Sequence, residues 1–184
     1  MPPSPPPSPT PAPTPTPTTP TPPPPLHALH LGVTPTFSLL LPSSRTHLCV
    51  SRSSVVPFSG TAIVNAANSR CLGGGGVDGA VSRAGGPVLY AARESLPLVG
   101  DPDEEVRCPV GTAVVTTGGD LKAAYCVHAV GPNYNTFGEG EVEEADGLLR
   151  AAYIDSMRVA RRERDPPVKT IAFSLLSAGV FRGE

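Results

Sequence analysis

Apolar residues along the chain occur first in short runs and then at wider spacing, and each spacing predicts a different element. Residues 37–41 and 47–50 flank the turn-forming residues 42–45, which predicts a β-hairpin. Three further short runs of apolar and β-branched residues predict strands. These runs are residues 61–64, 112–117 and 124–130.

Two longer segments are predicted to be helices, the second from the 3.6-residue spacing of its apolar residues. The first comprises residues 79–84 and 88–96, interrupted at residues 85–87 by the sequence GGP. The second is predicted over residues 142–164, where acidic residues crowd the start and arginines crowd the end, as suits the helix dipole. Its apolar positions predict one buried stripe. That stripe consists of Leu149, Tyr153, Met157 and Ala160.

A hairpin followed by strands that alternate with helices predicts an α/β fold with a mixed sheet. The last strand, residues 170–176, is apolar along most of its length, as expected of a strand covered on both faces. In such sheets, ligands bind at the carboxyl ends of the strands. The loops that follow residues 64 and 176 are therefore the two candidates for a binding site.

Composition divides the chain into unequal parts. Of its 25 prolines, 15 lie in residues 1–25, which otherwise hold almost only threonine and serine. A stretch with no core-forming side chains and few backbone donors predicts a disordered, extended tail of polyproline character. We interpret it as a spacer rather than as a ligand for a proline-binding domain. Residues 26–35 are then a linker, and residues 36–184 form one folded domain.

Charge and cysteine spacing exclude several classes of function. A net charge of −2 offers no basic surplus for nucleic acid, and no apolar run approaches the roughly 20 residues that span a bilayer. The cysteines are widely spaced and form no metal-binding pair. We therefore expect reduced thiols and no metal site in an intracellular protein of the cytoplasm, the nucleus or an organelle. We also expect a monomer without a cofactor. The four cysteines are Cys49, Cys71, Cys108 and Cys126.

The first candidate loop joins an apolar strand to a helix through four consecutive glycines, residues 73–76. Glycines let backbone amides approach a ligand, and a helix N-terminus attracts phosphate, so this loop is suited to cradle a diphosphate. Neither the P-loop spacing nor the Rossmann spacing is present. A flexible surface loop is the alternative interpretation.

Two polar residues, Asn68 and Asp78, flank the glycines ten positions apart. A carboxylate beside a phosphate site is unfavourable unless it does something there, such as orienting a water or a ribose hydroxyl. The alternatives are structural, because aspartate often caps a helix N-terminus and asparagine often braces a loop. The residues alone leave both interpretations open.

The second candidate loop, residues 177–183, again follows a strand with small residues and glycine. Its aromatic residue, Phe181, is placed either to cover a ligand or to join the core. Arg182 is expected to be a solvated surface arginine rather than a phosphate ligand.

Residues 62–79, which begin AIVNAAN and include the glycine run, resemble the signature of macrodomains. The resemblance is to the subgroup that hydrolyses mono-ADP-ribose linkages and O-acetyl-ADP-ribose. Residues 107–111 and 127–132 resemble the family's middle strands, and residues 171–183 resemble its second phosphate loop. The similarity covers about residues 36–184. It implies a three-layer α/β fold around a mixed central sheet.

The resemblance also implies an ADP-ribose site between the two loops. Asn68 and Asp78 would be catalytic, with Asn68 bonding a hydroxyl of the distal ribose and Asp78 holding or activating the attacking water. Phe181 would pack against the same ribose. The remaining implied binding residues lie around the diphosphate, most of them contributing backbone amides. They are Ala67, Gly74, Gly75, Gly76, Val77, Ser177, Ala178, Gly179 and Val180.

The partners implied are ADP-ribose or O-acetyl-ADP-ribose and mono-ADP-ribosylated proteins, with hydrolysis at the distal ribose. A non-catalytic reader of ADP-ribosylated proteins and an inactive fragment are the alternatives. Ser54 stands where the family has the aspartate that recognises adenine, and Ser82 stands where the hydrolytic subgroup commonly has histidine. The sequence ends at Glu184, whereas the family continues through a helix, a strand and a helix. We therefore expect a C-terminally truncated domain in which the adenine-binding half of the ADP-ribose site is weakened.

Overall fold

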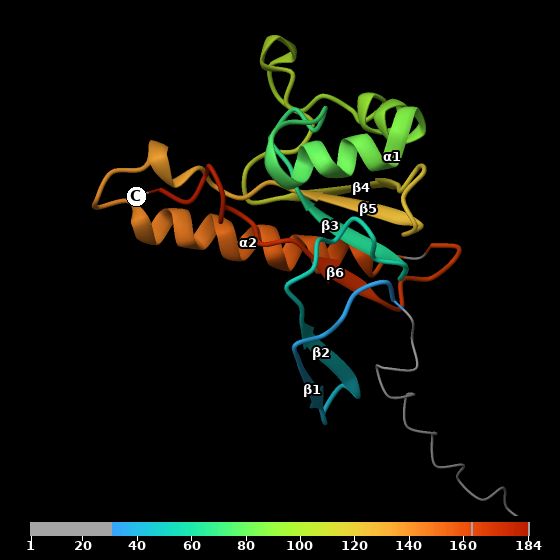
Figure 1. Ribbon diagram of the computed structural model, residues 1–184. Helices are drawn as coiled ribbons and strands as arrows, with labels where there is room; N and C mark the ends of the chain where they lie inside the picture. The colour runs from blue at the N-terminus through green and yellow to red at the C-terminus, as the bar shows by residue number, and fades with distance from the viewer. Residues whose placement is uncertain (1–30, 163, 184) are drawn as a thin grey trace, which may run out of the picture.

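The computed structural model describes residues 31–162 and 164–183. The predicted disordered tail and half of the predicted linker fall outside this part of the chain. The described residues form a four-stranded sheet between two long helices, with a hairpin set apart from it (Figure 1). No helix among them is long and apolar enough to cross a membrane.

The central sheet has the strand order β4-β5-β3-β6. Strand β3 runs parallel to both of its neighbours, whereas β4 is antiparallel to β5, so the sheet is mixed, as the sequence predicts. The carboxyl ends of the three parallel strands β3, β5 and β6 consequently lie at the same end of the sheet. The element bounds are β3 Ala62–Ala66, β4 Ala113–Thr117, β5 Tyr125–Ala129, β6 Ile171–Phe173, α1 Gly76–Glu94 and α2 Val142–Ala160.

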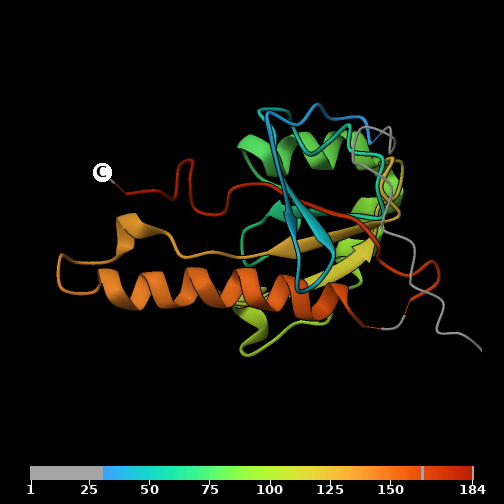
Figure 2. The same ribbon diagram turned by 90° about the horizontal axis from the view of Figure 1, so that it is seen from below.

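Helices α1 and α2 cover opposite faces of the sheet (Figures 1 and 2). Successive residues of β3 alternate between the two layers: Ile63 packs in a cluster with Val81 of α1, and Val64 packs in a cluster with Ala152 of α2. Both strand residues are fully buried, which explains why β3 is apolar on both sides. The predicted three-layer α/β architecture is confirmed.

Helix α1 is bent. Gly86 has a left-handed backbone (φ 64°, ψ −165°) and is followed by Pro87, so the two helical runs expected from the sequence meet at a sharp kink. The bend favours glycine because of this positive φ, which L side chains rarely adopt, whereas the nearest atom to an added Cβ is the movable Oδ2 of the exposed Asp120. The second half of α1 therefore runs in a different direction from the first.

Helix α2 differs from its prediction in two ways. It ends at Ala160 rather than at residue 164, and Met157, which we expected in the buried stripe, is 43% exposed. The other three residues of the predicted stripe, Leu149, Tyr153 and Ala160, do pack in the core, and mostly small side chains are fully buried beside them. The buried positions are Ala145, Ala152, Ser156, Val159 and Ala160.

Strand β6 is shorter and more exposed than predicted. It spans Ile171–Phe173 instead of residues 170–176, and all three of its residues are only half-buried. The reason is its place at the edge of the sheet, where β3 is its single partner among the described strands. The prediction of a strand covered on both faces is therefore wrong for β6.

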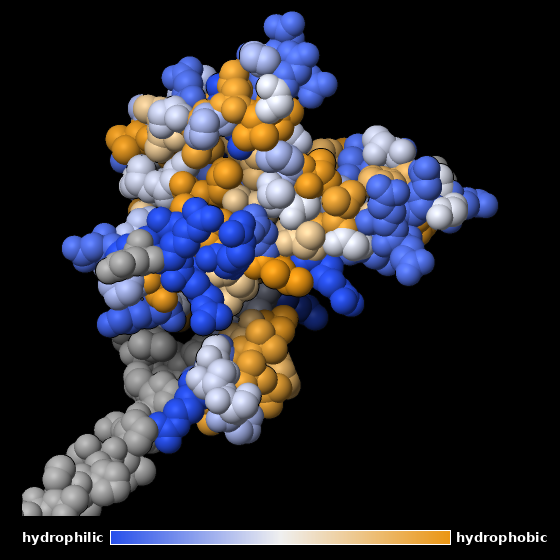
Figure 3. Space-filling model, turned by 180° about the vertical axis from the view of Figure 1, so that it is seen from behind, coloured by the Kyte–Doolittle hydropathy of each residue, from blue (hydrophilic) through white to orange (hydrophobic). Residues whose placement is uncertain are grey.

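The predicted hairpin is present as β1 (Phe37–Leu41) and β2 (Thr46–Val50). Within the described residues it is a two-stranded sheet of its own and does not join the central sheet. Every residue of β1 is exposed, and apolar surface covers much of the hairpin (Figure 3). The hairpin therefore adds little to the core and does not position the site described next.

Candidate functional site

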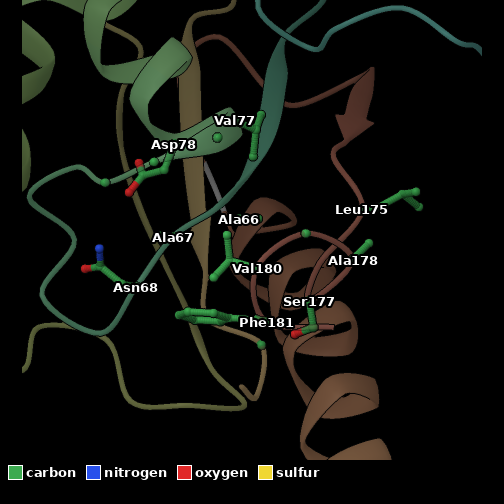
Figure 4. Close-up of a pocket in the computed structure, with 15 residues that line it drawn as sticks. Ala66, Ala67, Asn68, Val77, Asp78, Leu175, Ser177, Ala178, Val180 and Phe181 are labelled. Carbon is green, nitrogen blue, oxygen red and sulfur yellow. The ribbon is translucent and has the colours of Figure 1, made fainter. Parts of the chain in front are cut away.

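A pocket opens at the edge of the sheet where β3 and β6 end (Figure 4). Its volume is about 270 Å³, close to the lower end of small-molecule pockets, which hold roughly 300–1,000 Å³. All twelve residues that the sequence assigned to the site line this one pocket. Three further residues that the sequence analysis did not name line it as well: Ala66, Gly131 and Leu175.

The glycine loop forms one wall. Gly73 and Gly76 have left-handed backbones (φ 107° and 56°), and an added Cβ at Gly75 or Gly76 would meet nothing within 4 Å. Gly75 is the N-cap of α1 and provides no side-chain cap. The first amides of α1, which have no partner within the helix, therefore border an open space. Such a helix N-terminus favours an anion.

Asn68 braces this loop from within. Its amide nitrogen donates to the carbonyl oxygen of Gly73 across 2.8 Å, and its carbonyl oxygen accepts from the backbone amides of Arg70 and Cys71 at 3.1 and 3.2 Å. The structural interpretation of Asn68 thus holds in this state of the protein. The side chain still lines the pocket, beside Asp78 (Figure 4).

Asp78 lies inside the first turn of α1, so the alternative interpretation of this residue as a helix cap is wrong, because Gly75 occupies the cap position. The residue is only 3% exposed. Its Oδ1 accepts from Asn65 Nδ2 at 2.8 Å and from Arg93 Nη2 at 2.5 Å. Its Oδ2 has no hydrogen-bond partner among the described residues. One oxygen is therefore fixed by the protein, and the other remains available to a ligand.

Gly74 lies between the two candidate catalytic side chains. A Cβ on Gly74 would be 3.1 Å from Asn68 Nδ2 and 3.3 Å from Asp78 Oδ2. Backbone, amide and carboxylate consequently converge on one small volume. Glycine at this position leaves that volume free.

The second loop forms the opposite wall. Ser177 has a left-handed backbone (φ 52°), and its hydroxyl donates to the carbonyl oxygen of Pro132 across 2.7 Å. Phe181 is half-buried and lines the pocket, and its carbonyl oxygen accepts from the amide of Tyr134 at 2.9 Å. Val180 is 86% exposed at the rim. The loop is thus fastened at both ends, with its aromatic ring turned to the pocket rather than to the core (Figure 4).

Behind Asp78, the buried polar side chains of Asn65, His128 and Thr116 form a row that was not predicted from the sequence. His128 Nδ1 lies 3.4 Å from Asn65 Nδ2, and His128 Nε2 lies 2.9 Å from the Thr116 hydroxyl. Burial, and next the positive charge of Arg93, lowers the pKa of His128 to about 3. The imidazole is therefore neutral at physiological pH.

A signal for part of this row exists in the sequence. Asn65 is a polar residue at the end of an otherwise apolar strand, and in the structure it is fully buried. A buried amide in such a place needs specific partners. Arg93 gave no comparable signal, because it follows Asp78 by fifteen positions on a helix whose bend the sequence did not specify.

Two residues that depart from the macrodomain pattern lie in different surroundings. Ser54 is exposed, outside the pocket lining, and its hydroxyl accepts from the amide of Val56 at 3.2 Å. The hydroxyl of Ser82 donates to the carbonyl oxygen of Asp78 at 2.8 Å and accepts from Arg93 Nη1 at 2.7 Å. Ser82 thus belongs to the support of the carboxylate, and Ser54 does not contact the pocket.

The cysteines are free thiols, and three of the four are buried. Within residues 31–162 and 164–183, no three His, Cys, Asp or Glu side chains lie close enough together to hold a metal ion. Arg182, expected to be solvated, is exposed at the end of the second loop.

The arrangement defines a class of site: a pocket between a glycine-rich helix N-terminus and a second small-residue loop, with a carboxylate at one end. The family model described as Macro domain matches residues 64–184, and this chain belongs to that family.

Individual relatives and a solved structure agree with this membership. A macro domain-containing protein of Caldanaerobacter subterraneus is 44% identical over 130 residues, which are 71% of this chain and 67% of the relative. The O-acetyl-ADP-ribose deacetylase 1 of Pantoea vagans is 39% identical over 134 residues, 73% of this chain and 71% of that protein. The solved macrodomain of Oceanobacillus iheyensis with ADP has a TM-score of 0.65 and 28% identity, and the match covers 79% of this chain and 72% of that chain.

Proposed function

We propose that the pocket binds ADP-ribose and that the chain hydrolyses a bond at its distal ribose. The substrates would be mono-ADP-ribosylated proteins, O-acetyl-ADP-ribose or both. The observation that carries this proposal is Asp78, a residue of the pocket lining whose buried Oδ2 has no hydrogen-bond partner among the described residues. The ligand is suggested by family membership, by the relative named as a deacetylase and by the solved neighbour with ADP.

The diphosphate would lie between the two loops. On one side, the first amides of α1 and the open space at Gly75 and Gly76 favour negative charge. On the other side, Gly179 leaves the same kind of open space, since a Cβ there would meet nothing within 4 Å. A diphosphate held by backbone amides at both walls needs no arginine or lysine in the pocket lining, and none is found there among the described residues.

The distal ribose would then lie between Asp78 and the ring of Phe181. Asp78 Oδ2 would accept a hydrogen bond from the attacking water and so direct its oxygen toward the ribose or the ester carbon. The proton of that water would pass to the leaving group or to solvent. Positioning of this kind contributes to catalysis by fixing the reacting atoms at attack distance.

A second candidate function is binding without hydrolysis. It is favoured by Asn68, whose amide nitrogen and carbonyl oxygen both hold the glycine loop in place. An Asn68 that keeps these bonds in the complex would stabilise the loop but would not orient a ribose hydroxyl. The chain would then be a reader of ADP-ribosylated proteins. The expected intracellular location and monomeric state remain predictions.

The test uses the full chain with a mono-ADP-ribosylated protein and, separately, with O-acetyl-ADP-ribose, and it follows release of the sugar or of acetate. Calorimetry with free ADP-ribose measures binding in the same preparation. We expect hydrolysis by the parent chain and a loss of at least about a hundredfold in Asp78→Asn, which keeps the shape of the side chain. Binding of ADP-ribose without any hydrolysis would establish the reader. No binding by the folded chain would reject both functions.

A further inference from the structure

Arg93 is a buried cation beside the site that neither the sequence motifs nor the pocket lining identifies. It lies in the last turn of α1 and is 1% exposed, the largest fully buried side chain of the described residues. Nη2 donates to Asp78 Oδ1 at 2.5 Å, and Nη1 donates to the Ser82 hydroxyl at 2.7 Å. A guanidinium so far from water is tolerated only where it has such partners.

This contact depends on the bend in α1. In a straight helix, fifteen residues would separate Asp78 from Arg93 by about 22 Å along the axis, which is too far for one side chain to reach. The kink at Gly86 folds the second half of the helix back, so that its last turn meets its first. The bend is itself held from outside, because the amide of Asp120 donates to the carbonyl oxygen of Gly85 at 3.0 Å.

We propose that Arg93 is the positioning residue for Asp78, an inference that rests on the proposed hydrolysis. Arg93 and Asn65 both bind Oδ1 of the carboxylate, from two different elements. Two donors in different directions fix the rotation of the carboxylate as well as its place. Oδ2 is thereby held near Gly74 of the pocket lining, where it has no hydrogen-bond partner among the described residues. Arg93 does not touch the pocket itself and acts only through Asp78.

Loss of Arg93 would leave Asn65 as the single donor to Oδ1. The carboxylate would then be free to rotate about that one hydrogen bond, and Oδ2 would no longer be held toward the substrate. Misplacement of a catalytic group by about 1 Å costs on the order of a hundredfold in rate. Among the described residues, the Arg93 side chain donates hydrogen bonds to Asp78 and Ser82 and to no residue of the glycine loop or the second loop, so binding of the diphosphate should change little.

The test compares Arg93→Met, which keeps the length and removes the charge, with Arg93→Lys, which keeps the charge and one donor. We expect Arg93→Met to lower kcat by about a hundredfold with KM and the Kd of ADP-ribose changed by less than about threefold, and Arg93→Lys to recover part of that loss. Arg83→Met is the matched control, since Arg83 is an exposed arginine of the same helix, and it should equal the parent.

The outcomes separate this inference from the proposed function. A parent chain without hydrolysis rejects the function. A parent that hydrolyses, together with an Arg93→Met variant that binds ADP-ribose and keeps kcat within about threefold, rejects the role of Arg93. If Arg93→Met does not fold, Arg93→Lys decides: we expect it to fold and to show a lower kcat at unchanged KM, and equal losses in binding and kcat would show a merely structural role.

Discussion

Asn65 donates its side-chain amide to Asp78 Oδ1 across 2.8 Å, and this bond connects the middle strand of the sheet to the first turn of α1. Both residues are buried, so the bond lies away from water. A buried inner strand of the sheet therefore sets the position of the carboxylate in the pocket lining.

Replacement of Asn65 should reveal this bond through stability as well as activity. We expect Asn65→Leu to lose about 1–3 kcal/mol of unfolding free energy, because Oδ1 of a buried carboxylate loses a donor. Asn65→Asp should be less stable still, since it places two carboxylates within hydrogen-bond distance. Urea unfolding at neutral pH measures the unfolding free energies of the parent and the two variants and so tests this order. An Asn65→Asp variant as stable as the parent would contradict the geometry.

Gly74 should be intolerant of any side chain. A Cβ there comes within 3.3 Å of both Asn68 and Asp78, so a valine would fill the volume between them. We expect Gly74→Val to weaken ADP-ribose binding at least about tenfold, a change of about 1.4 kcal/mol, measured by calorimetry. Gly140→Val is the control, because an added Cβ at Gly140 meets nothing within 4 Å. Equal binding by the two variants would place the ligand elsewhere.

His128 predicts how stability changes with pH. Its pKa is lowered to about 3 in the fold by burial, from 6.5 in an unfolded chain. Between pH 6.5 and pH 3, His128 is protonated in the unfolded chain but not in the folded chain. The free energy of unfolding therefore has its full value above about pH 6.5 and falls as the pH decreases toward 3. The slope from this residue should be about 1.4 kcal/mol per pH unit.

Urea unfolding at pH 7, 6 and 5 measures that slope. His128→Gln, which retains hydrogen-bonding capacity but cannot take up the proton, should show a smaller loss over the same range. NMR should find the His128 ring neutral throughout. A ring that becomes protonated near pH 6 in the folded chain would overturn the interpretation.

The thiols should differ sharply in reactivity. Cys49 is half-buried, whereas the other three are buried. Burial raises the pKa of Cys126 to about 12, and a hydrogen bond with Cys108, followed by burial, raises the pKa of Cys71. The hydrogen bond from Cys71 lowers the pKa of Cys108, yet Cys108 is inaccessible in the fold.

We therefore expect one thiol to react quickly with a disulfide reagent in the folded chain and three more to react only after unfolding. Cys49→Ser should abolish the fast reaction and leave the slow ones. A second fast thiol in Cys49→Ser would show that the loop holding Cys71 opens readily.

The pocket could be predicted from the sequence because its chemistry is local. The glycine run, Asn68 and Asp78 lie within eleven residues, and a strand end followed by a helix start determines where they point. The second loop could be predicted for the same reason. Parallel pairing of β3 with β6 then brings the two loops together.

The predictions that failed concern features that are set by contacts between distant segments of the chain. The buried stripe of α2 was predicted correctly at Leu149, Tyr153 and Ala160, which pack in the core, but not at Met157, which is 43% exposed. The exposure of β6 follows from its edge position. Arg93 could not be found at all, since its partner is reached only through the bend at Gly86.

That bend has a consequence for how the protein tolerates mutation. Gly86 lies outside the pocket lining, yet any other residue there would be strained in the left-handed backbone. A substitution that straightens the helix would withdraw Arg93 from Asp78 and so behave like an active-site mutation. In a random mutational screen, inactive variants should therefore form two groups: one at the pocket, and one at the hinge of α1 and the turn that supports it.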